Sequence, residues 1–314
     1  MAGKNQNSEE KSIRILKIIK RLYQKEILNG TDLANEFNVD IKTVQRDIET
    51  LRAYFLEENG AEIKYSKSKK GYYLEENSEK SFTNEELLAI SKIILESRAF
   101  NKNETQTLIN KLINHSSGND RETIKGLINS EKSNYIPLQH GQNLLTVIWN
   151  LAQHIKNQEL IHINYTTKDK QNKNHNIKPL SIMFSEYYFY LIAYIENKEE
   201  YPAILRIDRI TEIKNTGKKF KILNYSKKFK DGEFRKYIHF MHSGPLTRIE
   251  FKYRGYIEYV LDKFPTAKIL DEKIVEENNW KTTVYTVKIE AYGSFGAEMW
   301  LRSQGDYVIE YKIL

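Results

Sequence analysis

A short segment of the chain carries polar side chains suited to contacting nucleic acid. They are Lys42, Thr43, Gln45 and Arg46. Arginine and glutamine can pair with base edges in the major groove of DNA, and lysine and threonine suit phosphate oxygens. The apolar residues of the same segment are Val44, Ile48, Leu51 and Phe55. Their helical spacing gives one buried side, so the polar residues fall on the exposed side. The segment therefore predicts a helix that recognises DNA, with Gln45 and Arg46 on bases and the other two on the backbone.

Residues 30–54 have the pattern of two helices joined by a tight turn, which would position this helix. Thr31 or Asp32 is expected to cap the first helix and Asp40 the second, because their side-chain oxygens can accept hydrogen bonds from free backbone N–H groups. Val39 is the expected apolar plug of the turn at 38–40. The pattern is typical of a helix-turn-helix.

A basic hairpin is expected directly after these helices. Residues 62–65 and 71–74 read as strands, and the turn between them carries Lys67, Lys69 and Lys70. Lysines at such a tip neutralise phosphates without reading bases. A small helical packing domain with a charged loop is the alternative, but a hairpin at this distance favours the wing of a winged helix that binds DNA.

Composition excludes several kinds of site. The 314 residues include no cysteine, which excludes disulfides and thiolate metal sites and fits the cytoplasm. No apolar run reaches the length of a membrane span. Among the seven histidines the closest pair, His239 and His242, has no acidic partner at metal-site spacing. We therefore expect no metal, no cofactor and no membrane partner.

The excess positive charge of the chain lies outside the predicted DNA-binding winged helix. Residues 135–230 carry 15 Lys and Arg against 8 Asp and Glu, while the whole chain has a net charge of +7. A basic region of this kind predicts a second anionic partner. The alternative is that the charges only aid solubility.

The rest of the chain reads as helices followed by two β regions. Thr83 and Glu86 form an expected capping box at the start of a helix, and further helices are expected at 103–115, 121–130 and 141–158. Expected strands at 160–166, 176–184, 187–194 and 201–213, with a loop at 168–174, predict a small barrel. Residues 246–314 show the order β-α-β-β-α-β, which predicts a ferredoxin-like fold. Trp149, Trp280 and Trp300 are expected in cores.

Four motifs together resemble the WYL-domain family of bacterial transcriptional regulators. Phe189-Tyr190-Leu191 stands where the family has Trp-Tyr-Leu, and residues 205–210 carry its R-x-D-R-I segment. Tyr165 and Pro179-Leu180 match upstream positions, and residues 300–305 match the W-L-x-S-x-G of the extension that follows WYL domains. Only the first letter of the triplet departs from the family, and an aromatic residue is kept.

The resemblance implies an α+β multidomain protein in the family's order. The expected parts are a winged helix over 1–80, a helical spacer over 81–134, an Sm-like β-barrel WYL domain over 135–230 and the C-terminal extension over 240–314. It also implies a DNA-binding regulator, usually a homodimer, whose WYL domain senses a ligand. In several family members that ligand is a nucleic acid or nucleotide.

The residues expected to bind the ligand are Tyr165, Tyr188, Tyr190, Arg206 and Arg209. Tyr188 and Tyr190 share one face of a strand and suit base stacking, while an arginine offers a fork for phosphate. Strict alternation separates Arg206 from Arg209, so both can line one pocket only if the strand ends or bulges near Asp208. The alternative is that either arginine pairs with Asp208 as scaffold.

The sequence as a whole predicts a cytoplasmic repressor, not an enzyme and without catalytic residues. It would bind an inverted-repeat operator in double-stranded DNA as a homodimer and respond to an anionic ligand such as a nucleotide or single-stranded nucleic acid. One rival is a nucleotide- or RNA-processing enzyme fused to a winged helix, with His162, Ser181 and Ser185 as its only candidates. Another is a structural nucleic-acid binder without a switch.

Overall fold

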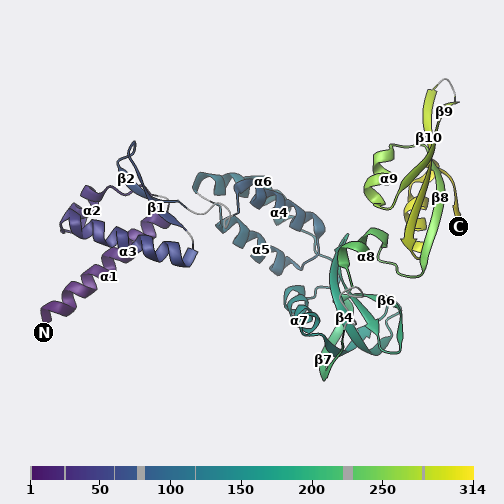
Figure 1. The fold of residues 1–314 in the computed structure, drawn as a ribbon, viewed down its shortest axis with the longest axis horizontal. Coiled ribbons are helices and arrows are strands. Elements are labelled where there is room, and N and C mark those ends of the chain that lie inside the picture. The colour runs from purple at the N-terminus through teal and green to yellow at the C-terminus, as the bar shows by residue number, and fades with distance from the viewer. Residues whose placement is uncertain are drawn as a thin grey trace. The chain divides into compact units, whose positions relative to one another are not determined.

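The computed structural model describes residues 2–24, 26–59, 61–75, 82–116, 118–221, 229–277 and 280–314. The side chains of residues 2–9, 57–59, 118–119, 277 and 280 are outside this description. The chain forms two compact units, residues 1–92 with 109–130 and residues 93–108 with 131–314 (Figure 1). No described helix combines the length and apolar character needed to cross a membrane.

The N-terminal part contains three helices and a hairpin. They are α1 (Ala2–Tyr23), α2 (Gly30–Glu36), α3 (Ile41–Asn59), β1 (Glu62–Ser66) and β2 (Gly71–Glu75). The four apolar residues predicted on the inner side of α3 are at most 2% exposed, and they pack against Ile18 and Leu22 of α1. β1 and β2 pair antiparallel, as expected for the basic hairpin. The core therefore fixes α3 with its polar side outward.

The caps of these helices differ in part from the expectation. Asn29, rather than Thr31 or Asp32, caps α2, because the helix begins at Gly30 and the Asn29 side chain accepts from the N–H groups of both predicted residues. The same Asn29 side chain donates to the carbonyl of Lys70, at 2.9 Å. Asp40 caps α3 as predicted, accepting from the N–H of Thr43 at 2.6 Å.

Three helices follow, α4 (Asn84–Ser97), α5 (Lys102–Asn114) and α6 (Gly118–Ser133). The predicted capping box is present at the start of α4: Thr83 N–H donates to Glu86, and Glu86 N–H donates to the Thr83 hydroxyl. Residues 77–81, a polar stretch with the composition of a linker, lie outside the described residues.

A helix and a five-stranded antiparallel sheet come next. They are α7 (Leu144–Asn157), β3 (Glu159–Thr166), β4 (Asn172–Ser185), β5 (Tyr188–Ile195), β6 (Lys198–Arg206) and β7 (Ile210–Lys219), in the sheet order β6-β5-β4-β3-β7. The sheet is open: no described ladder joins β6 to β7. The predicted barrel is therefore seen only as a helix packed on an unclosed sheet, with Leu144 and Leu151 of α7 in the shared core.

Two details of this sheet correct the sequence analysis. The single strand expected over 201–213 is interrupted by a short 3-10 turn, η1 (Ile207–Arg209), which ends β6 at Arg206. The loop expected over 168–174 is shorter, because β4 already begins at Asn172 and pairs with the end of β3. The chain changes partners across η1, from β5 for β6 to β3 for β7, and pairing with β3 extends β4 back to Asn172.

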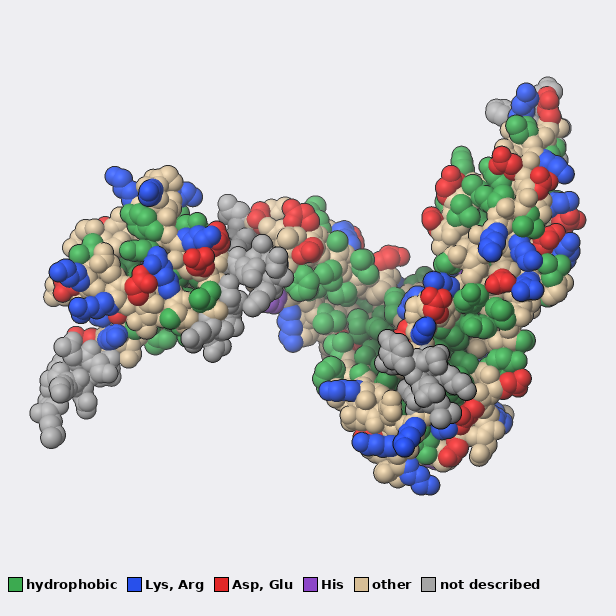
Figure 2. All heavy atoms as spheres, viewed as in Figure 1, with side chains coloured by type: hydrophobic (Ala, Val, Ile, Leu, Met, Phe, Trp, Pro, Cys, Tyr) green, Lys and Arg blue, Asp and Glu red, His purple; other side chains and the backbone are tan. Residues whose placement is uncertain are grey.

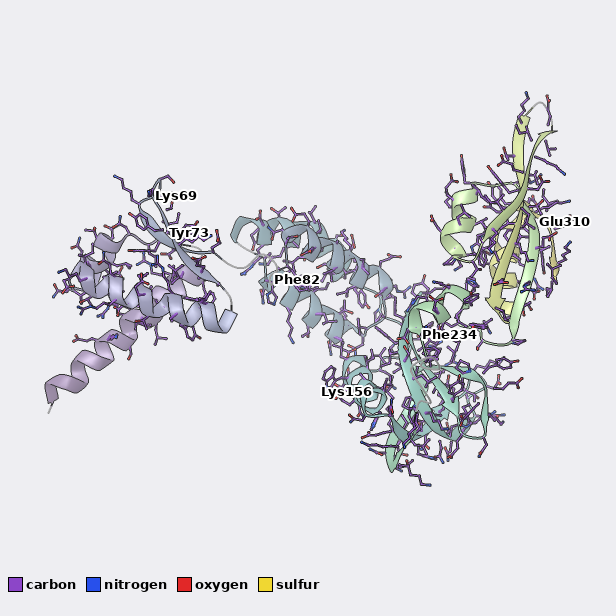
Figure 3. All side chains as sticks on the ribbon, in the orientation of Figure 1. Lys69, Tyr73, Phe82, Lys156, Phe234 and Glu310 are labelled. Carbon is purple, nitrogen blue, oxygen red and sulfur yellow. The ribbon has the colours of Figure 1, made fainter. Side chains whose placement is uncertain are left out.

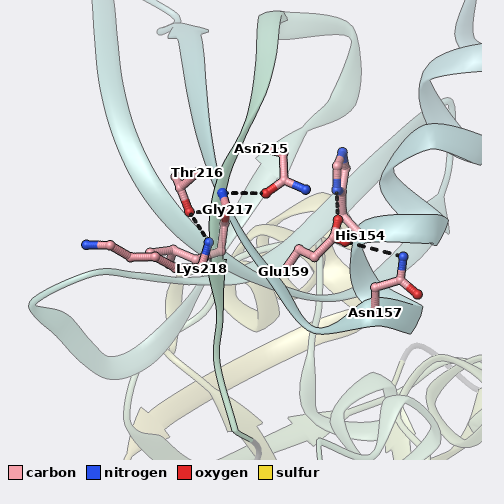
Figure 4. A network of polar contacts seen from close by, with 8 residues as sticks. His154, Asn157, Glu159, Asn215, Thr216, Gly217 and Lys218 are labelled. Carbon is pink, nitrogen blue, oxygen red and sulfur yellow. Dashed lines mark hydrogen bonds and ion pairs between the residues drawn. The ribbon is translucent and has the colours of Figure 1, made fainter.

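A polar network closes the far end of the sheet, where α7, β3 and β7 meet (Figure 4). His154 of α7 contacts Glu159 of β3 at 2.6 Å. The N–H of Gly217 donates to the side chain of Asn215 at 2.8 Å, and Gly217 has a φ of +74°. The contact between Gly217 and Asn215 therefore lies at a tight bend in β7, next to Lys218.

The tryptophans divide between core and surface. Trp300 is 8% exposed in the C-terminal core, as expected, whereas Trp149 is 69% exposed on α7, where the core interpretation is wrong. The side chain of Trp280 lies outside the described residues. The helical spacing that buries Leu144 and Leu151 turns Trp149 to the other side of α7.

Helix α8 (Asp231–Tyr237) carries Phe234, which is labelled in Figure 3. Its ring packs on that of Tyr292, with ring centroids 5.5 Å apart. The elements after it are β8 (Leu246–Tyr253), α9 (Ile257–Lys263), β9 (Lys268–Glu277), β10 (Trp280–Tyr292), α10 (Phe295–Ser303) and β11 (Val308–Ile313). This is the predicted order β-α-β-β-α-β. The antiparallel sheet has the order β11-β8-β10-β9, so β10 lies between β8 and β9 as in a split β-α-β unit. Alternate residues of β8 and β10 are buried with residues of α9 and α10.

Candidate nucleic-acid and ligand sites

The polar side of α3 lies open to solvent. Lys42, Gln45 and Arg46 are exposed and Thr43 is half-buried. The hydrogen bond from the Thr43 backbone N–H lowers the pKa of Asp40, so this cap stays ionised at the start of the helix. An anchored inner side and exposed donors outside are the features that insertion into the major groove requires.

The hairpin is fixed next to α3 and places its lysines at the tip. Leu28 and Tyr72 exchange two backbone hydrogen bonds of 2.8 Å, which join the hairpin to the loop before α2. Lys67, Lys69 and Lys70 are exposed, and Figure 2 shows basic side chains gathered around this hairpin, with Lys69 labelled in Figure 3. A groove of about 380 Å³ has both Gln45 and Lys70 in its lining. The structure thus brings a predicted base contact and a predicted phosphate contact to one groove.

A buried ion pair behind the recognition helix was not predicted. Asp47 of α3 accepts from Arg14 of α1 at 2.6 Å, and the two side chains are 2% and 8% exposed. Asp47 follows Arg46 directly, so a predicted base contact on the exposed side of α3 and a buried anchor are consecutive residues. The signal in the sequence was the stripe Val44, Asp47, Ile48, Leu51, in which a carboxylate occupies a buried helical position.

The five-stranded sheet holds an arginine stacked on a tyrosine. The guanidinium carbon of Arg206 lies 3.4 Å from the ring centroid of Tyr188, and the same guanidinium donates two hydrogen bonds to Asp208, at 3.0 and 2.7 Å. Burial opposes the charge, but the bonds to Asp208 outweigh it and raise the pKa of Arg206. Arg206 is therefore paired with Asp208, as the scaffold alternative required. The pair fixes the orientation of the guanidinium and uses only two of its five N–H donors.

Two predicted tyrosines join this cluster. The Tyr165 hydroxyl accepts from the backbone N–H of Arg206 at 3.3 Å, and Tyr190 lies opposite Arg206 in the β5–β6 ladder. The Tyr188 and Tyr190 rings are 6.4 Å apart. Burial raises the pKa of Tyr190, so its hydroxyl remains a donor near neutral pH.

Arg209 is the exception among the predicted ligand residues. It lies in η1, immediately after Asp208, where the end of β6 removes the constraint of strict alternation. Its side chain makes no hydrogen bond or ion pair with any residue that the structure describes. Arg209 is therefore a half-buried cation without an internal partner, next in sequence to the Arg206–Asp208 pair.

His140 is a neighbour of the cluster that sequence reasoning missed. Burial lowers its pKa, and Asp208, Arg206 and Glu104 all act on it electrostatically. Its Nδ1 accepts from the N–H of Gln142 at 3.0 Å, while its buried Nε2 has no partner among described residues. A donor position therefore remains unused close to Asp208.

Phe100 and α5 contact the sheet and α7, respectively. Glu104 of α5 accepts from the N–H groups of Leu144 and Leu145 at the start of α7, at 3.1 and 2.9 Å. Phe100 packs on Phe189, with centroids 5.5 Å apart. Phe189, the first residue of the triplet, thus links the sheet to the segment before α5, while Tyr190 faces the arginine.

The candidates for catalysis have other partners. Ser181 donates to Asp231 at 2.6 Å, and His162 contacts Asn176 at 2.9 Å. No hydrogen bond between described residues joins His162 to Ser181 or Ser185. The described chain also contains no group of three potential metal-ligating side chains.

Two domain families match the chain: an HTH domain over residues 14–73 and a WYL domain over residues 146–215. No curated protein matches it. Among solved structures, proteasome accessory factor B/C (PafBC) of Arthrobacter aurescens is similar at 13% identity with a TM-score of 0.29, over 91% of this chain and 42% of that one. A CRISPR Cas-related protein is similar at 12% identity with a TM-score of 0.32, over 96% of this chain and 78% of that one. The chain thus spans well under two thirds of the length of PafBC.

Proposed function

We propose that this chain, which carries an N-terminal HTH domain and a WYL domain as a WYL-domain regulator does, is a ligand-responsive repressor of transcription. It acts in the cytoplasm as a homodimer on an inverted-repeat operator. The observation that carries the proposal is the exposed polar side of α3 beside the basic hairpin, with Gln45 and Lys70 on one groove. One such DNA-contacting surface covers only one half-site of an operator, so high sequence specificity needs two copies related by a twofold axis.

The ligand proposed for the WYL domain is an anion with a flat ring, such as a nucleotide or a short single strand. The free part of the Arg206 fork and the unpartnered Arg209 suit phosphate oxygens, and Tyr188 and Tyr190 suit a base. Phe100 contacts the same sheet and Glu104 accepts hydrogen bonds from the start of α7, so the segment before the WYL domain is joined to this domain. To regulate, the ligand must bind two arrangements of the dimer with different affinity.

Arg46→Ala tests the DNA-reading helix. It is expected to weaken binding to an operator selected by the wild-type protein from random duplexes by about 1–3 kcal/mol, with little change on unselected DNA, because a lost base contact removes discrimination. Titration of both duplexes at one salt concentration measures this, with Lys42→Ala as the backbone-contact control. An Arg46→Ala protein that kept its full preference for the operator would remove this assignment.

Alanine at Lys67, Lys69 or Lys70 tests the wing. Each change is expected to weaken binding to selected and unselected DNA alike. It is also expected to reduce the slope of log affinity against log salt concentration by about 0.9 per lost phosphate contact. Lys64→Ala is the control on the same hairpin, because Lys64 is already neutralised by Glu75. Equal salt slopes for the tip variants and the wild type would show that the hairpin does not contact the DNA backbone.

A further inference from the structure

Strand β11 is an open edge of the C-terminal sheet. It pairs with β8 on one side, and no described strand covers its other side. The N–H of Leu314 donates to the carbonyl of Arg248 at 2.8 Å, in register with the β8–β11 ladder. Because hydrogen-bonded and non-hydrogen-bonded pairs alternate in an antiparallel ladder, the backbone groups of Tyr311 and Ile313 point away from β8. The edge therefore presents donors and acceptors that another strand can use.

Large apolar side chains lie exposed on this edge strand between its charged residues. Ile309 and Ile313 are 50% and 51% exposed. Exposed edges in proteins are usually blunted by charge, proline or a bulge along the free strand, because they otherwise pair with other chains. The bulge of β11 lies before Glu310, so residues 310–313 remain in regular register. The exposed isoleucines therefore favour an edge that another chain covers in the functional oligomer.

The sequence of β11 is complementary to itself when the strand is reversed. Residues 309–313 read Ile-Glu-Tyr-Lys-Ile. In an antiparallel pair of two copies centred on Tyr311, each Glu310 faces the other copy's Lys312, and both residues lie in the part of β11 that is in regular register. Tyr311 lies on the axis, where its outward N–H and C=O can exchange two hydrogen bonds with its own copy.

The charges of the neighbouring strand continue this pattern. Within one chain Glu310 pairs with Lys252 at 2.8 Å, and Lys312 pairs with Glu250 at 2.9 Å (Glu310 is labelled in Figure 3). Across the twofold axis each row would read Lys252, Glu310, then Lys312 and Glu250 of the second copy. The sign alternates at every step, so the second copy extends an existing ladder of ion pairs instead of opposing it.

The other edge of the sheet fits a second copy less well. In β9 the comparable register is centred on Glu272, which would place two carboxylates opposite each other on the axis. A bulge beside Asp271 also interrupts that register. β9 therefore serves as the control edge.

We infer that β11 is the dimer contact: a second copy of this chain pairs antiparallel with it about Tyr311 and joins the two C-terminal sheets into one. The contact is isologous, so it closes as a dimer. It rests on the proposed function only in giving a surface to the homodimer, since the pairing itself needs neither DNA nor ligand.

Charge reversal tests this register in the full chain. Glu310→Lys and Lys312→Glu each place like charges in both cross-axis pairs and are expected to weaken self-association about tenfold or more. An equimolar mixture of the two variants restores opposite charges in both pairs, so it is expected to associate like the wild type. Sedimentation velocity at micromolar concentration measures the three samples, and Lys273→Glu on β9 is the matched control with no expected effect.

A second variant tests the backbone contact. Ile313→Pro removes an N–H that points away from β8, so it is expected to keep the fold and weaken the dimer. The inference is overturned if the wild type dimerises but ignores these changes, or if the mixture does not recover association; either result leaves the proposed DNA-binding function standing. A wild-type chain that stays monomeric with and without operator contradicts both this contact and the proposed homodimer.

Discussion

Asp47→Ala is expected to destabilise the N-terminal domain by about 3–5 kcal/mol. The change leaves the guanidinium of Arg14 buried between α1 and α3 without the carboxylate that lies 2.6 Å away. Tryptophan fluorescence cannot report it, because all three tryptophans lie in the second unit. Amide hydrogen exchange of peptides from α3 can, and it is expected to accelerate by a factor of roughly 10² to 5 × 10³.

The same helix offers a matched control. Glu49 pairs with Arg52 on the exposed side, where its side chain is 65% exposed, so Glu49→Ala removes a carboxylate of comparable chemistry at little cost. Replacing both members of the buried pair by apolar residues, Arg14→Met with Asp47→Leu, is expected to recover most of the loss, because no charge is then left buried. If Asp47→Ala exchanges no faster than Glu49→Ala, the pair contributes nothing to holding α3.

The DNA-binding half was largely predictable because its signals are local. The spacing of Val44, Ile48, Leu51 and Phe55 identified the buried side of α3, and the structure confirms it. Asp40 was identified as a cap because capping depends on neighbours in sequence. Asn29 was missed because its role depends on where α2 begins and on a carbonyl of Lys70, 41 residues away. Asp47 was missed for a similar reason: its partner Arg14 lies on another helix.

The half that contains the WYL domain was less predictable because its contacts are non-local. The resemblance located Tyr190, Arg206 and Arg209, and alternation indicated that both arginines could line one pocket only if the strand ended or bulged near Asp208. No sequence pattern gave the stack of Arg206 on Tyr188 or placed His140 near Asp208. The barrel expected from the strand count is an open sheet here, since strand number alone does not determine closure.

Arg206→Ala is expected to destabilise the second unit by about 3–5 kcal/mol, and not simply to abolish the response to ligand. The side chain of Asp208 is 5% exposed and receives two hydrogen bonds from Arg206, so the variant leaves a buried carboxylate unpaired. Unfolding in urea followed by tryptophan fluorescence measures this loss. The double variant Arg206→Ala, Asp208→Ala removes both charges and is expected to regain most of the stability. Equal stability of the single variant and the wild type would show that Asp208 is satisfied in another way.

Arg209→Ala separates ligand binding from stability, because Arg209 has no internal partner to lose. Its stability is expected to change by no more than about 0.5 kcal/mol. Loss of one charge-assisted contact should weaken the binding of a fluorescein-labelled single-stranded oligonucleotide of roughly eight nucleotides by about tenfold or more. Lys218→Ala, at the other end of β7, makes the same change in net charge and should have little effect. Because ligand binding and operator binding are linked, the oligonucleotide should shift the operator affinity by about 1–3 kcal/mol in the wild type and by less in Arg209→Ala. The ligand site lies outside the Tyr188–Arg206–Arg209 cluster if two variants still bind the oligonucleotide and respond to it as the wild type does. These variants are Arg209→Ala and the double variant Arg206→Ala, Asp208→Ala.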